Sequence, residues 1–150
     1  MSSPLYQIHR LSVDDCQDML AIESAAHTHP WSLASLQDCF GRFYRVEGLF
    51  ENHQLLGFSI VQQIIDEVTL MDICVSPTVQ GRGIGRLLLD SVITQAKAHA
   101  GVKIMLEVRQ SNLAAISLYQ KSGFVEIGRR QGYYPSESGA EDAILMDLSW

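Results

Sequence analysis

A carboxylate and a phenol stand close together in the segment KIMLEVRQSNLAAISLY, which runs from Lys103 to Tyr119. Residues 104–106 and Val108 predict a strand packed on both faces, with Glu107 inside it. A carboxylate buried without a partner costs several kcal/mol, or it takes up a proton. Glu107 is therefore expected either to be satisfied by polar neighbours or to transfer protons, and Tyr119 is a phenol that still carries a proton at neutral pH.

A glycine-rich segment, QGRGIGR, occupies residues 80–86 between a predicted strand and a predicted helix. Glycines let backbone N–H groups approach a ligand, and a helix N-terminus adds free donors and a positive dipole end, so the segment favours a phosphate or pyrophosphate. A P-loop needs a lysine after its last glycine, but Arg86 follows Gly85. The dinucleotide fingerprint needs a glycine at position 86, which disfavours a nicotinamide site.

The composition bounds the class of protein. The chain of 150 residues is 47% hydrophobic and 19% charged, which supports one globular domain over residues 1–150. Its net charge of −6 disfavours nucleic acid and anionic membranes as partners. We see neither a signal peptide nor an apolar run near the ~18 residues of a membrane-spanning helix. Three widely spaced cysteines without a CxxC pair indicate reduced thiols, so we expect a cytoplasmic protein.

Alternating patterns, caps and glycines predict the elements that must position these residues. Strands are expected at residues 6–11, 44–51, 55–65, 68–75, 103–108, 125–133 and 143–148, and helices at residues 12–26, 32–41, 84–101 and 112–122. A strand–helix–strand crossover in the middle implies a parallel pair. The predicted fold is α/β, a mixed, mostly antiparallel sheet with a central parallel pair and helices on both faces.

The glycine-rich segment resembles the coenzyme A signature [QR]-x-x-G-x-[GA] of the GNAT superfamily of N-acetyltransferases, with Gln80, Gly83 and Gly85 in the defining positions. The predicted order of elements is similar to that superfamily over nearly the whole chain. The resemblance implies a GNAT-type fold and acetyl-CoA as the cosubstrate, without a metal.

Four further segments resemble the ribosomal-protein-alanine N-acetyltransferases within that superfamily: HPWS at 29–32, LEVRQSNLAAISLYQKSGF at 106–124, YYP at 133–135 and EDAILMDL at 141–148. This resemblance implies acetyl transfer to the N-terminal alanine of a small-subunit ribosomal protein. It implies Glu107 as the base and Tyr119 as the acid. The acetyl-CoA contacts that it implies are Ile73, Cys74, Val75, Gly81, Arg82, Gly83, Ile84, Gly85, Arg86 and Asn112.

Neighbouring side chains offer alternatives to these roles. Glu107 could simply form a salt bridge with Arg109 or Arg129. Glu67 and Asp72 are rival acids. Tyr119, on an amphipathic helix, could be a core residue with its hydroxyl at the rim.

Cys74, His27 and His29 also carry reactive side chains, but their sequence contexts do not favour a catalytic or metal-binding role. Cys74 could form an acyl-cysteine, but a cysteine inside a strand is usually a small core residue. His27 and His29 lack an H-E-x-x-H arrangement or a third ligand, so we expect no metal. A turn-rich loop is expected between the strands at 125–133 and 143–148. Residues 129–142 are predicted to form the acceptor side, walled by Tyr133 and Tyr134, with a plain exposed hairpin loop as the alternative.

Three functions therefore remain open from the sequence. The first is acetylation of a protein N-terminus, and the second is acetylation of lysine side chains or a small amine. The third is a module that binds acetyl-CoA without catalysis, for which Glu107 would be irrelevant to turnover.

Overall fold

The computed structural model describes residues 5–137 and 139–150. Its strands are β1 (Tyr6–Arg10), β2 (Tyr44–Glu51), β3 (Gln54–Ile64), β4 (Glu67–Val75), β5 (Lys103–Arg109), β6 (Val125–Ser136) and β7 (Gly139–Ser149). Its α-helices are α1 (Cys16–Ala26), α2 (Leu33–Gln37), α3 (Ile84–Ala98) and α4 (Leu113–Lys121), and short 3-10 turns cover Val13–Asp15 and Pro77–Val79.

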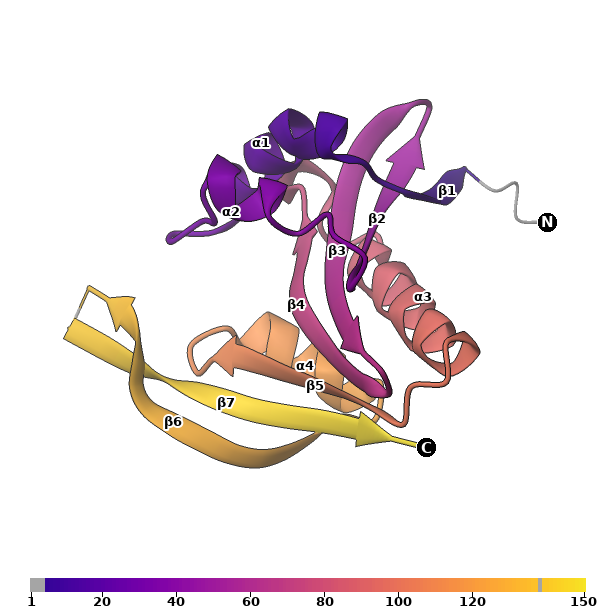
Figure 1. The fold of residues 1–150 in the computed structure, drawn as a ribbon. Helices are drawn as coiled ribbons and strands as arrows, with labels where there is room; N and C mark the ends of the chain where they lie inside the picture. The colour runs from indigo at the N-terminus through magenta and orange to yellow at the C-terminus, as the bar shows by residue number, and fades with distance from the viewer. Residues whose placement is uncertain (1–4, 138) are drawn as a thin grey trace.

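The strands form one sheet in the order β1-β2-β3-β4-β5-β7-β6, antiparallel except for the parallel pair β4 and β5. Helices α1 and α2 cover one face of the β2–β4 region and α3 covers the other (Figure 1). This arrangement confirms the predicted fold class and element order. Within residues 5–137 and 139–150, every helix is too short or too polar to cross a lipid bilayer.

Local sequence signals account for several boundaries. Ser12 and Asp15 form a reciprocal capping box at the start of the first helical segment, as their spacing predicts. Ser32 accepts a hydrogen bond from the Ser35 N–H and so begins α2. Gly123 follows α4 with a φ of 102°, the left-handed conformation that glycine adopts easily. Helix α2 is shorter than predicted, because it ends at Gln37.

The central parallel pair separates partway along its length. Pairing joins Glu67–Leu70 of β4 to Lys103–Leu106 of β5 and then stops, although both strands continue. On the other side of β4, Ile60 pairs with Asp72 and Val61 pairs with Leu70, so one extra residue bulges from β4. Bulges bend a strand and increase its twist. Beyond the bulge β4 and β5 are no longer paired, and β5–β7 turn away from β1–β4 in Figure 1.

The extra residue, Met71, also reverses which side chains of β4 face each layer. Before it, Val68 and Leu70 pack in the core under α3 and α4. After it, Cys74 packs in the core under α1 and α2 instead. Strict alternation from Leu70 would place Cys74 on the same face as Leu70. The bulge therefore turns Cys74, and Asp72 two residues before it, toward α1.

The prediction that β5 is packed on both faces is wrong. Ile104, Leu106 and Val108 are buried under α3 and α4, whereas Glu107 is exposed. The core beneath α1 and α2 draws on β2, β3 and β4 and includes no described residue of β5. One face of β5 is thus left open to solvent, and Glu107 lies on that face.

The prediction of a turn-rich loop between residues 133 and 143 is also wrong. Strands β6 and β7 extend through most of it and pair down to Ser136 and Gly139, with a register shift between Arg130 and Tyr134. Strand β6 is an edge strand, so Pro135 removes no hydrogen bond that a central strand would need. Turn-forming residues in this segment therefore produce an irregular strand rather than a loop.

Gly57 on β3 permits the close packing of β4 and α3 behind the separated strands. A Cβ atom there would lie 2.8 Å from the Cys74 carbonyl oxygen and 3.2 Å from Leu88 Cδ1. We expect Gly57→Ala to lower the free energy of unfolding by about 1–3 kcal/mol through overpacking, as measured by urea denaturation. Gly41→Ala is the control, because its Cβ would meet Tyr44 at 3.9 Å, an ordinary contact. Equal stability of the two variants would contradict this packing argument.

Candidate active site

A cleft of about 1100 Å³ opens where β4 and β5 separate. Strand β4, the loop before α3, the end of β5, helix α4 and the β6–β7 hairpin all contribute to its lining. The predicted site residues that line it are Ile73, Cys74, Val75, Gly81, Gly83, Ile84, Gly85, Arg86, Glu107, Asn112 and Tyr119. The structure thus brings together segments far apart in the chain, and the described lining omits one predicted residue, Arg82.

Glu107 reaches the cleft from the open face of β5. Its carboxylate Oε1 lies 3.2 Å from Nε of Arg130, and the two side chains are 31% and 55% exposed. Sequence reasoning named Arg109 and Arg129 as possible partners, but those pair with Glu141 and Glu126. Exposed ion pairs contribute about 0–1 kcal/mol, so Arg130 holds Glu107 only weakly. The carboxylate is therefore free to exchange its partner for a ligand or water in the cleft.

Tyr119 belongs to the core and to the cleft at once. Its ring is buried and lies 5.7 Å from the Phe124 ring, while the residue also lines the cleft. Burial, followed by the nearby Asp72, raises the pKa of Tyr119 above its ordinary value. The phenol therefore keeps its proton at neutral pH and can donate it.

The glycine-rich segment presents the beginning of α3 to the cleft. Gly81 and Gly83 have φ values of 87° and 79°, which other residues adopt only with strain, and Gly83 is the N-cap of α3. No side chain caps this helix, so its first N–H groups are available to an anion. Gly85 has a different role, because its Cβ would lie 3.4 Å from Leu118 Cδ2 on α4.

The two arginines of this segment differ. Arg86 lines the cleft and pairs with Asp90 at 3.0 Å, whereas Arg82 points to Glu51 at 3.5 Å. Both pairs are exposed. Asn112 lies across the cleft, where its Oδ1 accepts a hydrogen bond from the Ala115 N–H and caps α4.

The β6–β7 hairpin adds aromatic and charged groups to the rim. The rings of Tyr133 and Tyr134 meet edge to face at 5.0 Å, and the Arg109 guanidinium lies 4.5 Å from the Tyr134 ring centre. Arg109 also pairs with Glu141, which accepts hydrogen bonds from the backbone and hydroxyl of Ser111. These contacts fix Tyr134 at the cleft, as the expected wall, while Tyr133 stays half exposed.

Of the two rival acids, one is near the cleft. Glu67 begins β4, is exposed and lies outside the described lining, whereas Asp72 lines the cleft. Burial, followed by the neighbouring Glu23 carboxyl group, raises the pKa of Asp72 well above its ordinary value. Sequence reasoning missed Glu23, which is only 1% exposed. Its position four residues before His27 is the signal that could have pointed to it.

A seven-stranded sheet split at its parallel pair, a glycine turn at the start of α3, and a carboxylate and a phenol lining one cleft are the features expected of an acyl-coenzyme A transferase. The profile of the acetyltransferase (GNAT) family matches residues 5–124, and the chain belongs to that family. Acetyl-CoA is the acetyl donor of such enzymes.

Particular relatives are similar over nearly the whole chain. The [ribosomal protein bS18]-alanine N-acetyltransferase of Haemophilus influenzae is 42% identical, over 93% of this chain and 95% of the relative. The enzyme of the same name from Salmonella typhimurium is 41% identical, over 92% and 93%. The crystal structure of the ribosomal-protein-S18-alanine N-acetyltransferase from Escherichia coli has a TM-score of 0.93 at 39% identity, covering 96% of this chain and 93% of that one.

Proposed function

We propose that this chain acts as a single catalytic domain that transfers an acetyl group from acetyl-CoA to the α-amine of the N-terminal alanine of ribosomal protein bS18. The observation that carries the proposal is the near-complete match to enzymes of that name, at up to 42% identity. The cleft between β4 and β5 supports it, since a carboxylate, a phenol and the glycine turn before α3 all line it. A ribosomal protein as acceptor agrees with the expected cytoplasmic location.

The acetyl-CoA molecule is proposed to enter between the separated strands. Its pyrophosphate would bind the free N–H groups at the start of α3, with Arg86 adding positive charge. The unpaired edge of Ile73, Cys74 and Val75 offers backbone groups to the extended arm of the coenzyme. An N–H group there would stabilise the oxyanion that forms when the thioester is attacked.

Glu107 is proposed as the base. An α-amine has a reference pKa of ~7.7–8.0, so most of it is protonated near neutral pH and only the neutral amine attacks a thioester. Glu107 takes the proton from the ammonium group, directly or through one water molecule. The nitrogen then forms a bond to the acetyl carbon, and the carbon–sulfur bond breaks. The enzyme forms no covalent intermediate in this scheme.

Tyr119 is proposed as the acid. The departing coenzyme A leaves as a thiolate, and the phenol gives its proton to the sulfur. Burial keeps that proton on Tyr119 until it is needed, as the raised pKa requires. The tyrosine then recovers a proton from solvent.

The acceptor is proposed to enter from the side of the β6–β7 hairpin. Tyr134 lines the cleft together with Ser136 and Glu137, and Tyr133 packs against Tyr134. Glu141 pairs with Arg109 and accepts a hydrogen bond from Ser111, so its negative charge is less available to attract the acceptor. The wall of this entrance is therefore mainly aromatic, with Glu137 as the nearby acid.

Acceptor peptides test this proposal directly. We expect an alanine-starting peptide to gain the mass of one acetyl group on its α-amine when incubated with the protein and acetyl-CoA. The matched control is the same peptide, containing an internal lysine, with a formyl group on its N-terminus. This blocked peptide should stay unmodified. Acetylation of the blocked peptide alone would replace the proposal with lysine acetylation. Coenzyme binding without turnover on purified bS18 or any of these peptides would indicate a non-catalytic module.

A further inference from the structure

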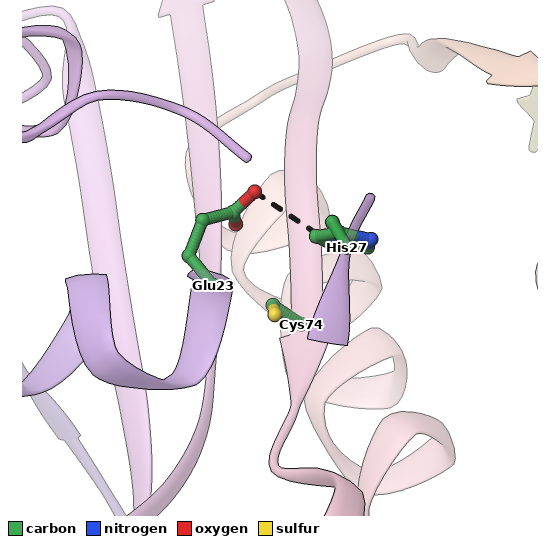
Figure 2. Close-up of side chains that lie close together, drawn as sticks. All are labelled: Glu23, His27 and Cys74. Atoms are coloured by element: carbon green, nitrogen blue, oxygen red, sulfur yellow. Dashed lines mark ion pairs between the residues drawn. The ribbon is translucent and has the colours of Figure 1, made fainter. Parts of the chain in front are cut away.

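A second group of reactive side chains lies beside the proposed catalytic pair. Glu23 lies on α1 and His27 directly follows that helix, and Asp72 and Cys74 come from β4. Figure 2 shows the Glu23 carboxylate directed at His27, with Cys74 on the adjacent strand. One ligand atom from each of Glu23, His27 and Cys74 lies within 4.8 Å of the others. We call Glu23, His27, Asp72 and Cys74 the α1–β4 cluster.

The end of a helix and the period of a strand build the α1–β4 cluster. Glu23 lies in the last turn of α1, and His27 follows that helix in an extended conformation. Residues two apart share a face of a strand, which aligns Asp72 with Cys74. The bulge at Met71 turns that strand face toward α1. Donor atoms of Glu23, His27 and Cys74 therefore converge, with Asp72 3.8 Å from His27, although no short sequence motif contains them.

Polar atoms in the α1–β4 cluster lack partners. Within the described residues, Glu23 Oε1, His27 Nε2 and Asp72 Oδ2 are buried without a hydrogen bond. Buried polar groups in proteins nearly always have one. The His27 Nε2 atom lies 3.9 Å from Glu23 Oε2 and 3.8 Å from Asp72 Oδ1, too far for hydrogen bonds. Glu23 Oε2 accepts a hydrogen bond from the Trp31 N–H at 3.1 Å, so Oε1 is the Glu23 oxygen left for a ligand.

We propose that the α1–β4 cluster binds a zinc-like transition-metal ion, with ligands from Glu23, His27, Asp72 and Cys74. Ligand atoms on a tetrahedral zinc ion lie about 3.4 Å apart, given bonds of about 2.0–2.2 Å to nitrogen and oxygen. The two separations from His27, 3.8 and 3.9 Å, exceed this by a few tenths of an ångström, and the donor atoms of Glu23, His27 and Cys74 lie within 4.8 Å of one another. His27, 32% exposed just after the helix, can move inward to close these separations. A sulfur and a nitrogen ligand favour zinc over magnesium and calcium, which prefer oxygen alone.

Protons compete with a metal ion for the α1–β4 cluster. Burial, followed by the neighbouring Glu23 carboxyl group, raises the pKa of Asp72. Burial, followed by Asp72 and Glu23, also raises the pKa of the Cys74 thiol. Metal binding breaks the S–H bond of Cys74, forms a sulfur–metal bond and releases the protons to solvent. The ion replaces the protons as the positive charge between the carboxylates.

The α1–β4 cluster lines the same cleft as Tyr119. A bound ion is therefore expected to slow acetyl transfer, a consequence that rests on the proposed function. Metal binding itself does not rest on it and is measured without any acetyl donor or acceptor. If the protein binds zinc but does not acetylate bS18, the proposed function is wrong and the proposed metal site is still supported.

Cobalt absorption provides the first test. We expect Co²⁺ added to the tag-free, chelator-treated protein to give a thiolate-to-cobalt charge-transfer band and tetrahedral ligand-field bands. Cys74→Ser should remove the charge-transfer band. Cys16→Ser, which alters a buried cysteine outside the cluster, should retain it. A spectrum without such a band in the unaltered protein, or one that persists in Cys74→Ser, would overturn the proposal.

Zinc affinity provides the second test and does not depend on a buried substitution. By calorimetry with zinc chloride, His27→Ala should bind zinc more than about tenfold more weakly, because even changes beyond the ligands commonly cost that much. His29→Ala should bind as tightly as the unaltered protein, since His29 is outside the α1–β4 cluster. An excess of magnesium chloride should leave zinc binding unchanged. Equal zinc affinity in the His27 and His29 variants would refute the assignment.

Discussion

Glu107→Gln is expected to lower kcat by about 100- to 10,000-fold, the usual contribution of a general base. Glutamine keeps the shape of glutamate and cannot accept the amine proton. The Kd for acetyl-CoA should stay nearly unchanged, because Glu107 lies across the cleft from the glycine turn at the start of α3. Steady-state kinetics with an alanine-starting peptide and calorimetry with acetyl-CoA measure the two quantities. Equal losses in kcat and coenzyme affinity would show that Glu107 has a structural role rather than a catalytic one.

Glu67→Gln is the matched control for this prediction. It makes the same change on the neighbouring strand, outside the described lining of the cleft, and should retain normal kcat. Asp72→Asn tests the buried rival. If Glu107→Gln kept full activity while Asp72→Asn lost it, the base would be the buried carboxyl group rather than the exposed one.

Tyr119→Phe is expected to lower kcat by about 100-fold, toward the small end of the range for general acids. The effect is smaller because a thiol with pKa near ~8.5 leaves with limited help. Phenylalanine keeps the ring that packs on Phe124, so the folded core should survive. Thermal unfolding should therefore give nearly the same Tm for both proteins, while single-turnover acetyl transfer is slowed.

Tyr134→Phe is the control that separates a proton donor from a wall of the cleft. Tyr134 also lines the cleft, and burial, followed by the nearby Glu107, raises its pKa as well. Its ring contacts remain in the variant, so we expect a small change in kcat and a larger change in the KM for the peptide. A 100-fold loss of kcat at Tyr134 with none at Tyr119 would show that the acid is misassigned.

Short-range signals in the sequence were sufficient for the element order. Residues close to a helix boundary predict it, as the Ser12–Asp15 capping box and the glycine after α4 do. The strand–helix–strand order predicts the parallel pair. Capping and turn formation depend on neighbouring residues, so one sequence displays them. The two strands of the β6–β7 hairpin were predicted, but their extension to Ser136 and from Gly139 was not, because the pairing there outweighs the local turn preference of glycine and proline.

The glycine turn and the pair Glu107 and Tyr119 were also found from sequence, through residue types and family resemblance. Their environment was not. Glu107 was expected to be buried, yet it is exposed and paired with Arg130, because the core under α1 and α2 includes no described residue of β5. Whether a helix covers a given face of a strand depends on helices far away in the chain. The local alternation of apolar and polar residues does not predict which helix that is.

The sequence by itself determined the order of the elements, the glycine turn before α3 and the types of the side chains proposed as reactive, since each depends on nearby residues or residue type. The tertiary structure alone decided where β4 and β5 separate and which way Asp72 and Cys74 point. One extra residue at Met71 reverses a strand face, and its position follows from the pairing of β4 with β3. The α1–β4 cluster exists because of that register, which is a property of contacts between strands.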